Sequence, residues 1–127
     1  MAENINDINV SGNVQISEEV IAVVSGIASM EIDGVIGMAE SLSSSISKLI
    51  GKKSLTKGVK SEIEGEDVKI VASIVVKYGC KIPDVAYQVQ QNIKKAVENM
   101  TGLNVTKVDV SISGIQRVEE TAETTEE

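Results

Sequence analysis

Apolar and polar residues alternate in several stretches of this chain, which is the pattern of β-strands with one buried face. The first stretch, INVSGNVQIS from residue 8, places Val10 and Val14 on the expected buried side. Two further stretches, GVKSEI and VKIVASIVVKY, are separated by EGED, whose glycine and acidic residues favour a hairpin turn. The last stretch, NVTKVDVSIS, ends near Ser113. We therefore predict four strands, with VIGM at residues 35–38 as a short fifth strand.

Two other stretches repeat their apolar residues every three or four positions, as a helix with one buried face does. The first helix is expected over residues 17–32, with Ser17 as its N-cap and Gly34 ending it. Its buried face is predicted to hold Val20, Val24, Ile27 and Ala28. The second helix is expected over residues 83–100, with Gly102 as a left-handed C-cap. Its apolar stripe is the clearest in the chain: Val85, Ala86, Val89, Ile93, Ala96, Val97 and Met100.

These elements predict an α+β fold in the order β-α-β-β-β-α-β, a split βαβ-like arrangement. The two main helices are expected on one face of a mixed sheet, which gives a two-layer α/β sandwich. The 127 residues suffice for a single domain, which we assign to residues 8–115 after a flexible N-terminus at 1–7. A mobile Ser/Lys loop is expected at residues 39–58. The acidic residues 116–127 have too few apolar side chains to offset the entropy of ordering, so a disordered tail is expected.

Composition narrows the classes of function. The chain has no histidine, the commonest general base and a usual zinc ligand, and its single cysteine cannot form an internal disulfide. A formal net charge of -7 disfavours nucleic acid as a partner, and the apolar runs are far shorter than the roughly 20 residues of a transmembrane helix. The glycine of LIGKKS lacks the upstream glycine of a phosphate-binding loop, and EGED has too few ligands for calcium. We therefore expect no catalytic residue, no cofactor, no metal and a cytoplasmic location.

The stretch YGCKIPD contains the only cysteine and the only proline, and raises the question of a reactive thiol. Tyr78 is expected to end the long strand on its core-facing side, Gly79 to permit the turn, and Pro83 to occupy the first turn of the helix. With no histidine to activate it, Cys80 is interpreted as a small, partly buried residue of a structural corner. A thiol-dependent enzyme or a redox sensor is the alternative.

Two surfaces are candidates for binding a partner. The sheet face away from the helices is expected to carry short side chains and few charges, which suits docking or self-association more than a face kept clear of other proteins. Its predicted residues are Ser11, Asn13, Val71, Ser73, Val75, Ser111 and Ser113. An ordinary solvent-facing sheet is the alternative. The second surface is a set of lysines that would contact anionic lipid, or would only keep the loop soluble: Lys48, Lys52, Lys53 and Lys57.

Two long stretches resemble the signature halves of the alkaline shock protein family, small envelope stress response proteins of Gram-positive bacteria. They are GNVQISEEVIAVVSGIASMEIDGVIGM and VVKYGCKIPDVAYQVQQNIKKAVENMTGLNVTKVDVSISGI, so the resemblance covers about residues 11–115. It rests on the glycine and Ile-Ser before the first helix, the Asp-Gly-Val after it, the Tyr-Gly and Ile-Pro of the corner, and the Met-Thr-Gly-Leu before the last strand. The family has no established catalytic residues, so the resemblance carries none over. The lysine loop falls in the variable part of the family pattern, which gives no support to its contact with lipid.

The resemblance implies a non-enzymatic cytoplasmic protein that associates with the membrane through partners or by self-assembly and supports the cell envelope under stress. Our first hypothesis is therefore a scaffold or interaction module at the inner face of the cell membrane, which binds copies of itself or a membrane-anchored protein. The alternative is a regulatory binding subunit of an enzyme of lipid or envelope metabolism.

Overall fold

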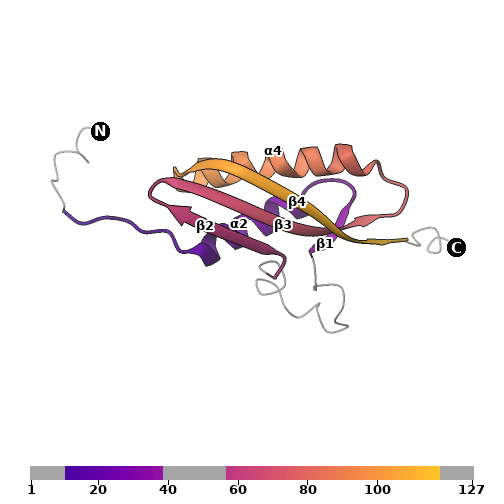
Figure 1. The fold of residues 1–127 in the computed structure, drawn as a ribbon, viewed down its shortest axis with the longest axis horizontal. Helices are drawn as coiled ribbons and strands as arrows, with labels where there is room; N and C mark the ends of the chain where they lie inside the picture. Colours follow the sequence, from indigo (N-terminus) through magenta and orange to yellow (C-terminus); the bar gives the residue numbers. More distant parts are fainter. Residues whose placement is uncertain (1–10, 39–56, 118–127) are drawn as a thin grey trace, which may run out of the picture.

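The computed structural model describes residues 11–38 and 57–117, which form two layers (Figure 1). One layer is a four-stranded sheet and the other consists of two helices that lie on the same face of it. The helices are α2 (Glu18–Met30) and α4 (Ile82–Thr101), and the strands are β1 (Val35–Met38), β2 (Val59–Glu64), β3 (Asp67–Lys77) and β4 (Asn104–Gln116). The predicted α+β fold with two layers is confirmed.

Strand β3 is the centre of the sheet and pairs with all three other strands. β1 and β2 run antiparallel to it and follow one another along one edge, opposite residues 74–76 and 67–72 of β3. β4 runs parallel to β3 along the other edge, from Asn104 opposite Asp67 to Gln116 opposite Lys77. The sheet is therefore mixed, and β4 extends beyond the predicted end near Ser113.

Local interactions fix where the helices begin and end. The Ser17 side chain accepts a hydrogen bond from the backbone N–H of Val20 at 3.3 Å, which caps the first turn of α2 as predicted. Gly102 has a left-handed φ of 77° and its N–H reaches the Glu98 carbonyl at 3.0 Å, which ends α4. Between the helices, the Asn92 amide of α4 donates to the Ala28 carbonyl of α2 at 2.8 Å.

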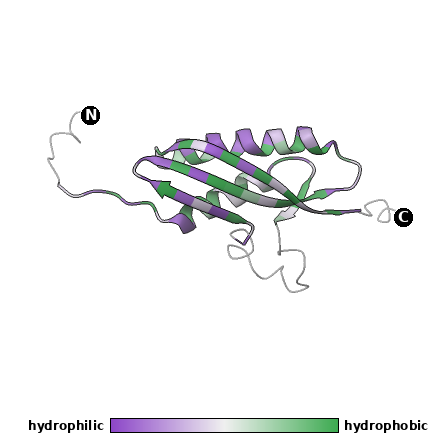
Figure 2. Cartoon of the chain, in the orientation of Figure 1, coloured by the Kyte–Doolittle hydropathy of each residue, from purple (hydrophilic) through white to green (hydrophobic). Residues whose placement is uncertain are grey.

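The core lies between the sheet and the helices. Every second residue of β3 faces the helices and has 0% exposure, as the alternation predicts: Val68, Ile70, Ala72, Ile74 and Val76. Figure 2 shows hydrophobic and hydrophilic residues alternating along the strands. From α4, the residues at helical spacing that complete this core are Val85, Val89, Ile93 and Val97. The core is aliphatic throughout, since the chain has no Phe or Trp.

The predicted first strand is wrong over the residues that the structure describes. Residues 11–17 form no strand, and Val14 is 87% exposed. Gly12 has a φ of +121°, which interrupts the regular extended backbone that strand pairing needs. Alternating residues form a strand only where another strand accepts their backbone hydrogen bonds, and no described strand pairs with this segment. Residues 8–10 of the prediction lie outside the described residues.

Two predictions about burial are also wrong. In α2, Val20 and Ile27 are exposed at 44% and 46%, whereas Ile21 is fully buried. The reason is that α2 carries apolar side chains on nearly every side, so that spacing alone does not select the face that packs. Tyr78 is 65% exposed instead of facing the core, because β3 ends at Lys77 and the chain turns there. The Tyr78 N–H bonds the Gln116 carbonyl at 2.8 Å.

Candidate interaction surface

The face of the sheet away from the helices brings together four of the predicted surface residues. Val71, Ser73 and Val75 alternate with the core residues of β3. Ser111 of β4 lies directly opposite Ser73 in the parallel register. The alternation of two strands and their register therefore place these four side chains on one surface, which we call the outer face.

The centre of the outer face is made of small residues. Val75 is only 7% exposed although it faces away from the core. Its neighbours on the two adjoining strands are Gly37 and Gly114, and a Cβ on Gly114 would lie 3.5 Å from a methyl group of Val75. Val71 is 39% exposed and is the most accessible apolar side chain of β3. The side chains at the centre of the outer face are therefore short, and few of them are charged.

The charged side chains of the outer face lie beside the N-terminal half of β3. On β2, Lys60 lies opposite Val71 and Glu62 opposite Lys69. On β4, Lys107 and Asp109 form an exposed ion pair at 3.7 Å, which contributes little to stability. Because these charges are of both signs, they give the outer face no single electrostatic preference.

The other three predicted surface residues lie elsewhere. Ser11 and Asn13 are exposed in the segment before α2 and do not belong to the sheet. Ser113 lies at an irregularity of the β3–β4 register, between the pairs of Ile74 and Val75, where its hydroxyl donates to the Ile74 carbonyl at 3.2 Å. These positions follow from the wrong first strand and from a bulge that the alternating pattern of β4 conceals.

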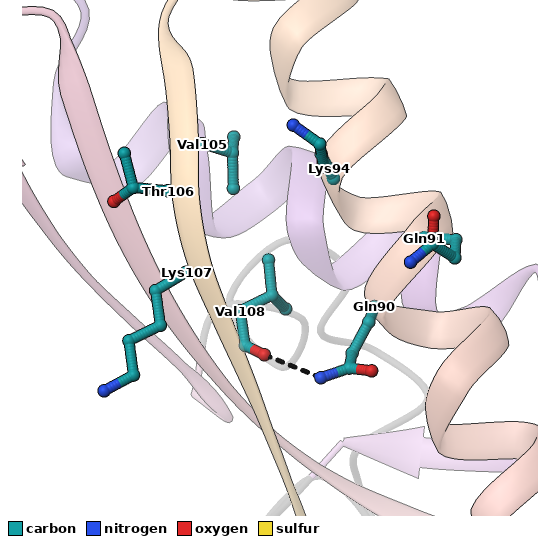
Figure 3. A pocket seen from close by; sticks show the side chains of 7 residues that line it. All are labelled: Gln90, Gln91, Lys94, Val105, Thr106, Lys107 and Val108. Atoms are coloured by element: carbon teal, nitrogen blue, oxygen red, sulfur yellow. Dashed lines mark hydrogen bonds between the residues drawn. The ribbon is translucent and has the colours of Figure 1, made fainter.

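A feature that sequence reasoning missed is the contact between α4 and the free edge of β4. The Gln90 side chain donates to the Val108 carbonyl at 2.9 Å, above a hollow that α4 and β4 line together (Figure 3). The Glu98 carboxylate accepts the Val105 N–H at 2.9 Å and pairs with Lys94 at 2.9 Å. These two interactions lower the pKa of Glu98 below its ordinary value of 4.5. Two backbone groups of the β4 edge are thus capped by side chains of α4.

The corner that contains the cysteine is held by backbone hydrogen bonds. The Lys77 N–H bonds the Gly34 carbonyl at 2.8 Å, and the Cys80 N–H bonds the Lys77 carbonyl at 3.2 Å. Cys80 is half-buried, and its Cβ faces the Gly34 backbone. Pro83 lies in the first turn of α4, where its missing N–H is tolerated. Gly79 has a φ of +99°, which agrees with the predicted turn.

Of the predicted lysines, only Lys57 is described; it is exposed and begins the turn into β2. Lys48, Lys52 and Lys53 lie outside the described residues. Neither helix of the described ranges, 11–38 and 57–117, is long and apolar enough to cross a membrane. Within the same ranges, no three metal-ligating side chains lie together.

Comparison with known proteins finds relatives that align with more than four fifths of this chain. It is 39% identical to the uncharacterized protein YqhY of Bacillus subtilis (strain 168) over 83% of this chain and 78% of that protein. It is 36% identical to the uncharacterized protein YloU of the same bacterium, over 83% and 89%. A stress response regulator gls24 homolog of Streptococcus pyogenes is 25% identical over 87% of this chain and 63% of the relative.

Solved structures and a family profile complete the comparison. Variants of MamM-CTD are 14% identical and align with 79% of this chain and 100% of theirs, at a TM-score of 0.49. The family profile matches residues 6–117, nearly the whole chain, and is described as having a cell envelope-related function. The chain therefore belongs to the alkaline shock protein 23 family.

Proposed function

We propose that this protein is a non-enzymatic interaction module of the envelope stress response, which acts as a scaffold through its outer face. The observation that carries the proposal is the composition of that face. Ser73, Ser111 and the glycine-flanked Val75 form an uncharged patch of small side chains, and the exposed Val71 lies at the border of this patch between Lys60 and Asp109.

The chemistry of the chain supports a binding role. There is no histidine in the whole sequence, and the corner around Cys80 contains no hydrogen bond to the thiol in the described part of the chain. The family is described by a cell envelope-related function, and a relative is named a stress response regulator. These descriptions support a role in the envelope stress response, to which the proposal adds action by contact with other proteins.

The proposed location is the cytoplasmic side of the cell membrane, reached through a membrane-anchored partner or through self-assembly. Under this proposal the lysines at 48, 52, 53 and 57 are dispensable, because the outer face provides the attachment. A second candidate, a regulatory subunit of an enzyme of lipid or envelope metabolism, is favoured by the word regulator in the relative's name.

Affinity capture from the native cell tests the proposal. The variant Ser73→Glu places a charge at the centre of the outer face, where Ser73 is half-buried and lies opposite Ser111. Val75→Glu is a poorer choice because Val75 is 7% exposed, so the charge would be buried. The matched control is Gln91→Glu, which adds the same charge to an exposed position of α4.

The proposal predicts that the wild type and Gln91→Glu recover the same partners and that Ser73→Glu recovers them at greatly reduced yield. Assemblies larger than a dimer should also be lost for Ser73→Glu in sedimentation. Equal recovery by all three proteins would show that the outer face is not the binding surface. Recovery of one stoichiometric enzyme would favour the regulatory subunit over the scaffold.

A further inference from the structure

Side chains of α4 form hydrogen bonds with the free edge of β4 in its N-terminal half, whereas no described residue does so from residue 109 to 112. β4 pairs only with β3 in the described part of the chain. The Asn104 N–H and the Gln116 carbonyl point toward β3, where they bond Glu66 and Tyr78. Val105 and Val108 point the opposite way: the Val105 N–H donates to the Glu98 carboxylate, and the Val108 carbonyl accepts from the Gln90 amide of α4. Side chains of α4 thus cap two backbone groups in the N-terminal half of this edge, and Figure 3 shows one of them, the Val108 carbonyl.

Beyond Val108, no described strand pairs with this edge. The register with β3 is unbroken from Val108 to Ile112, so Val110 and Ile112 also turn their N–H and C=O groups outward. No side chain of the described residues bonds them. Natural sheets protect such edges with lysine, proline, inward charges or bulges. Residues 109–112 contain no lysine and no proline, their one charged residue is Asp109, and the irregularities of the register lie outside them, at Thr106 and Ser113.

The apolar side chains along this bare stretch are incompletely covered. Val108, Val110 and Ile112 face the helices but are only partly buried, unlike their fully buried partners on β3. Ile115, farther along the strand, is 49% exposed. A strand added at this edge would satisfy the backbone groups and cover these side chains at the same time.

We propose that residues 109–113 of β4 pair antiparallel with the same residues of a second copy of this chain, around a twofold axis at Ser111. In this register, Val110 exchanges backbone hydrogen bonds with Ile112 of the second copy, and Ile112 with its Val110. These apolar side chains meet on the helix side of the joined sheet. On the outer side, Ser111 lies opposite Ser111 and Asp109 lies opposite Ser113.

The pairing is self-complementary, as a twofold contact must be. No like charges face each other, and the residue on the axis is small. The contact joins the outer faces of two copies into one surface of twice the area. It rests on the proposed function in ascribing self-association to the chain. Its hydrogen bonds come from the strand edge, and Ser111 on the axis is the one outer-face residue that it uses, so the dimer and the binding surface around Ser73 can each fail while the other holds.

A cysteine crosslink tests the geometry directly. In a full-length chain that carries Cys80→Ser, the substitution Ser111→Cys puts two thiols across the axis, where opposed Cα atoms of a non-hydrogen-bonded pair lie about 4.5 Å apart. The matched control is Ser73→Cys in the same background, one strand farther in on the same face. Two copies of Ser73 would lie about 14 Å apart, since strands are spaced by about 4.8 Å.

With glutathione disulfide as the oxidant, Ser111→Cys should form a covalent dimer on a non-reducing gel at least tenfold faster than Ser73→Cys, roughly the difference between a reachable and an unreachable pair. Equal rates for the two variants would overturn the proposal. So would a wild-type chain that stays monomeric in sedimentation equilibrium at high micromolar concentration. Finding the edge occupied by a strand of a different protein would overturn it as well, because the proposed occupant is a second copy.

Charge variants provide a test that does not use thiols. Ser111→Glu and Ser111→Lys each place like charges across the axis, and each alone should weaken the dimer roughly fivefold. An equal mixture of the two should recover the lost affinity as a heterodimer. Failure of the mixture to recover it, with both variants folded by circular dichroism, would contradict pairing at this residue. The Ser73→Glu variant should keep the dimer even where it loses partner capture.

Discussion

Replacement of Gly34 by alanine tests how the corner between α2 and β1 is packed against α4. Gly34 has a φ of +107°, a conformation that L side chains rarely adopt. An added Cβ would also lie 2.8 Å from a methyl carbon of Val85, closer than real Cβ contacts. Val85 is 5% exposed in the first turn of α4, so it has little room to move. The substitution therefore combines backbone strain with a steric overlap.

The two costs can be estimated separately. A non-glycine residue in a sparsely populated backbone conformation costs about 1–3 kcal/mol. Overpacking a core by one methyl group costs a further 1–3 kcal/mol or so. Gly79 offers a matched control, because its φ of +99° is similar and a Cβ there would meet nothing within 4 Å. Gly79→Ala should thus show the first cost alone, and Gly34→Ala the sum.

Urea unfolding, followed by circular dichroism, measures both variants against the wild type. Gly34→Ala should lose about 1–3 kcal/mol more of the free energy of unfolding than Gly79→Ala. Most of this difference should disappear in a Val85→Ala background, where the contacting methyl group is absent. Equal losses at the two glycines, or a difference that persists without the Val85 methyl groups, would refute the argument from close approach.

Three further predictions concern single side chains. The pKa of Glu98 is lowered by hydrogen bonds from Lys94 and the Val105 N–H, so its stabilising contribution is complete above pH 4.5 and is lost as the pH falls toward the lowered value. Glu98→Gln should therefore lower stability at neutral pH and flatten the loss of stability on acidification below pH 4.5, in urea titrations at several pH values. Ser25 is fully buried in α2 and its hydroxyl has no hydrogen-bond partner among residues 11–38 and 57–117, so Ser25→Ala should raise the free energy of unfolding by about 1 kcal/mol. Cys80→Ser should change stability by less than about 1 kcal/mol and leave partner capture intact, because Cys80 is only half-buried and its thiol makes no hydrogen bond in the described part of the chain.

A specific result would contradict each of these three predictions. If Glu98→Gln loses as much stability below pH 4.5 as the wild type does, another carboxylate governs acid unfolding. Destabilisation by Ser25→Ala would indicate a hydrogen bond of that hydroxyl that forms in solution. Loss of partner capture by a folded Cys80→Ser protein would revive the thiol as a functional group.

The failure of the predicted first strand has a simple physical basis. Alternation reports that one side of a segment is apolar, but a strand also needs a neighbour for its backbone groups. The stretch around Val14 has the pattern and lacks the neighbour in the described part, whereas β3 has both. The presence of a partner strand is a property of the whole fold and cannot be predicted from the ten residues INVSGNVQIS alone.

The two helices show when spacing predicts a packed face. α4 has polar and charged residues between its apolar ones, so its buried residues could be identified from the sequence. α2 is apolar on nearly all sides. Its spacing predicts that Val20 is buried, whereas in the structure Val20 is exposed and Ile21 is buried. Amphipathic contrast, and not apolar content, is what makes the face predictable.

The outer face was predictable in its centre and not at its borders. Val71 and Ser73 follow from the alternation of one long strand. The caps on the edge of β4 join residues 18 and 7 positions apart in sequence, Gln90 to Val108 and Glu98 to Val105. Such contacts depend on how far α4 lies from β4, which no local pattern encodes.

The way β1 and β2 share one edge of β3 makes the chain between them a natural place for insertion. Met38, at the end of β1, lies opposite Ile74, and the Gly58 carbonyl before β2 accepts the Ser73 N–H at 2.7 Å. The sheet thus holds the two ends of this connection beside neighbouring residues of one strand. Doubling the length of such a connection costs only about 0.6 kcal/mol in closure entropy. A peptide tag or a small reporter domain placed between residues 39 and 56 should therefore leave the sheet, its outer face and the β4 edge available for the experiments above.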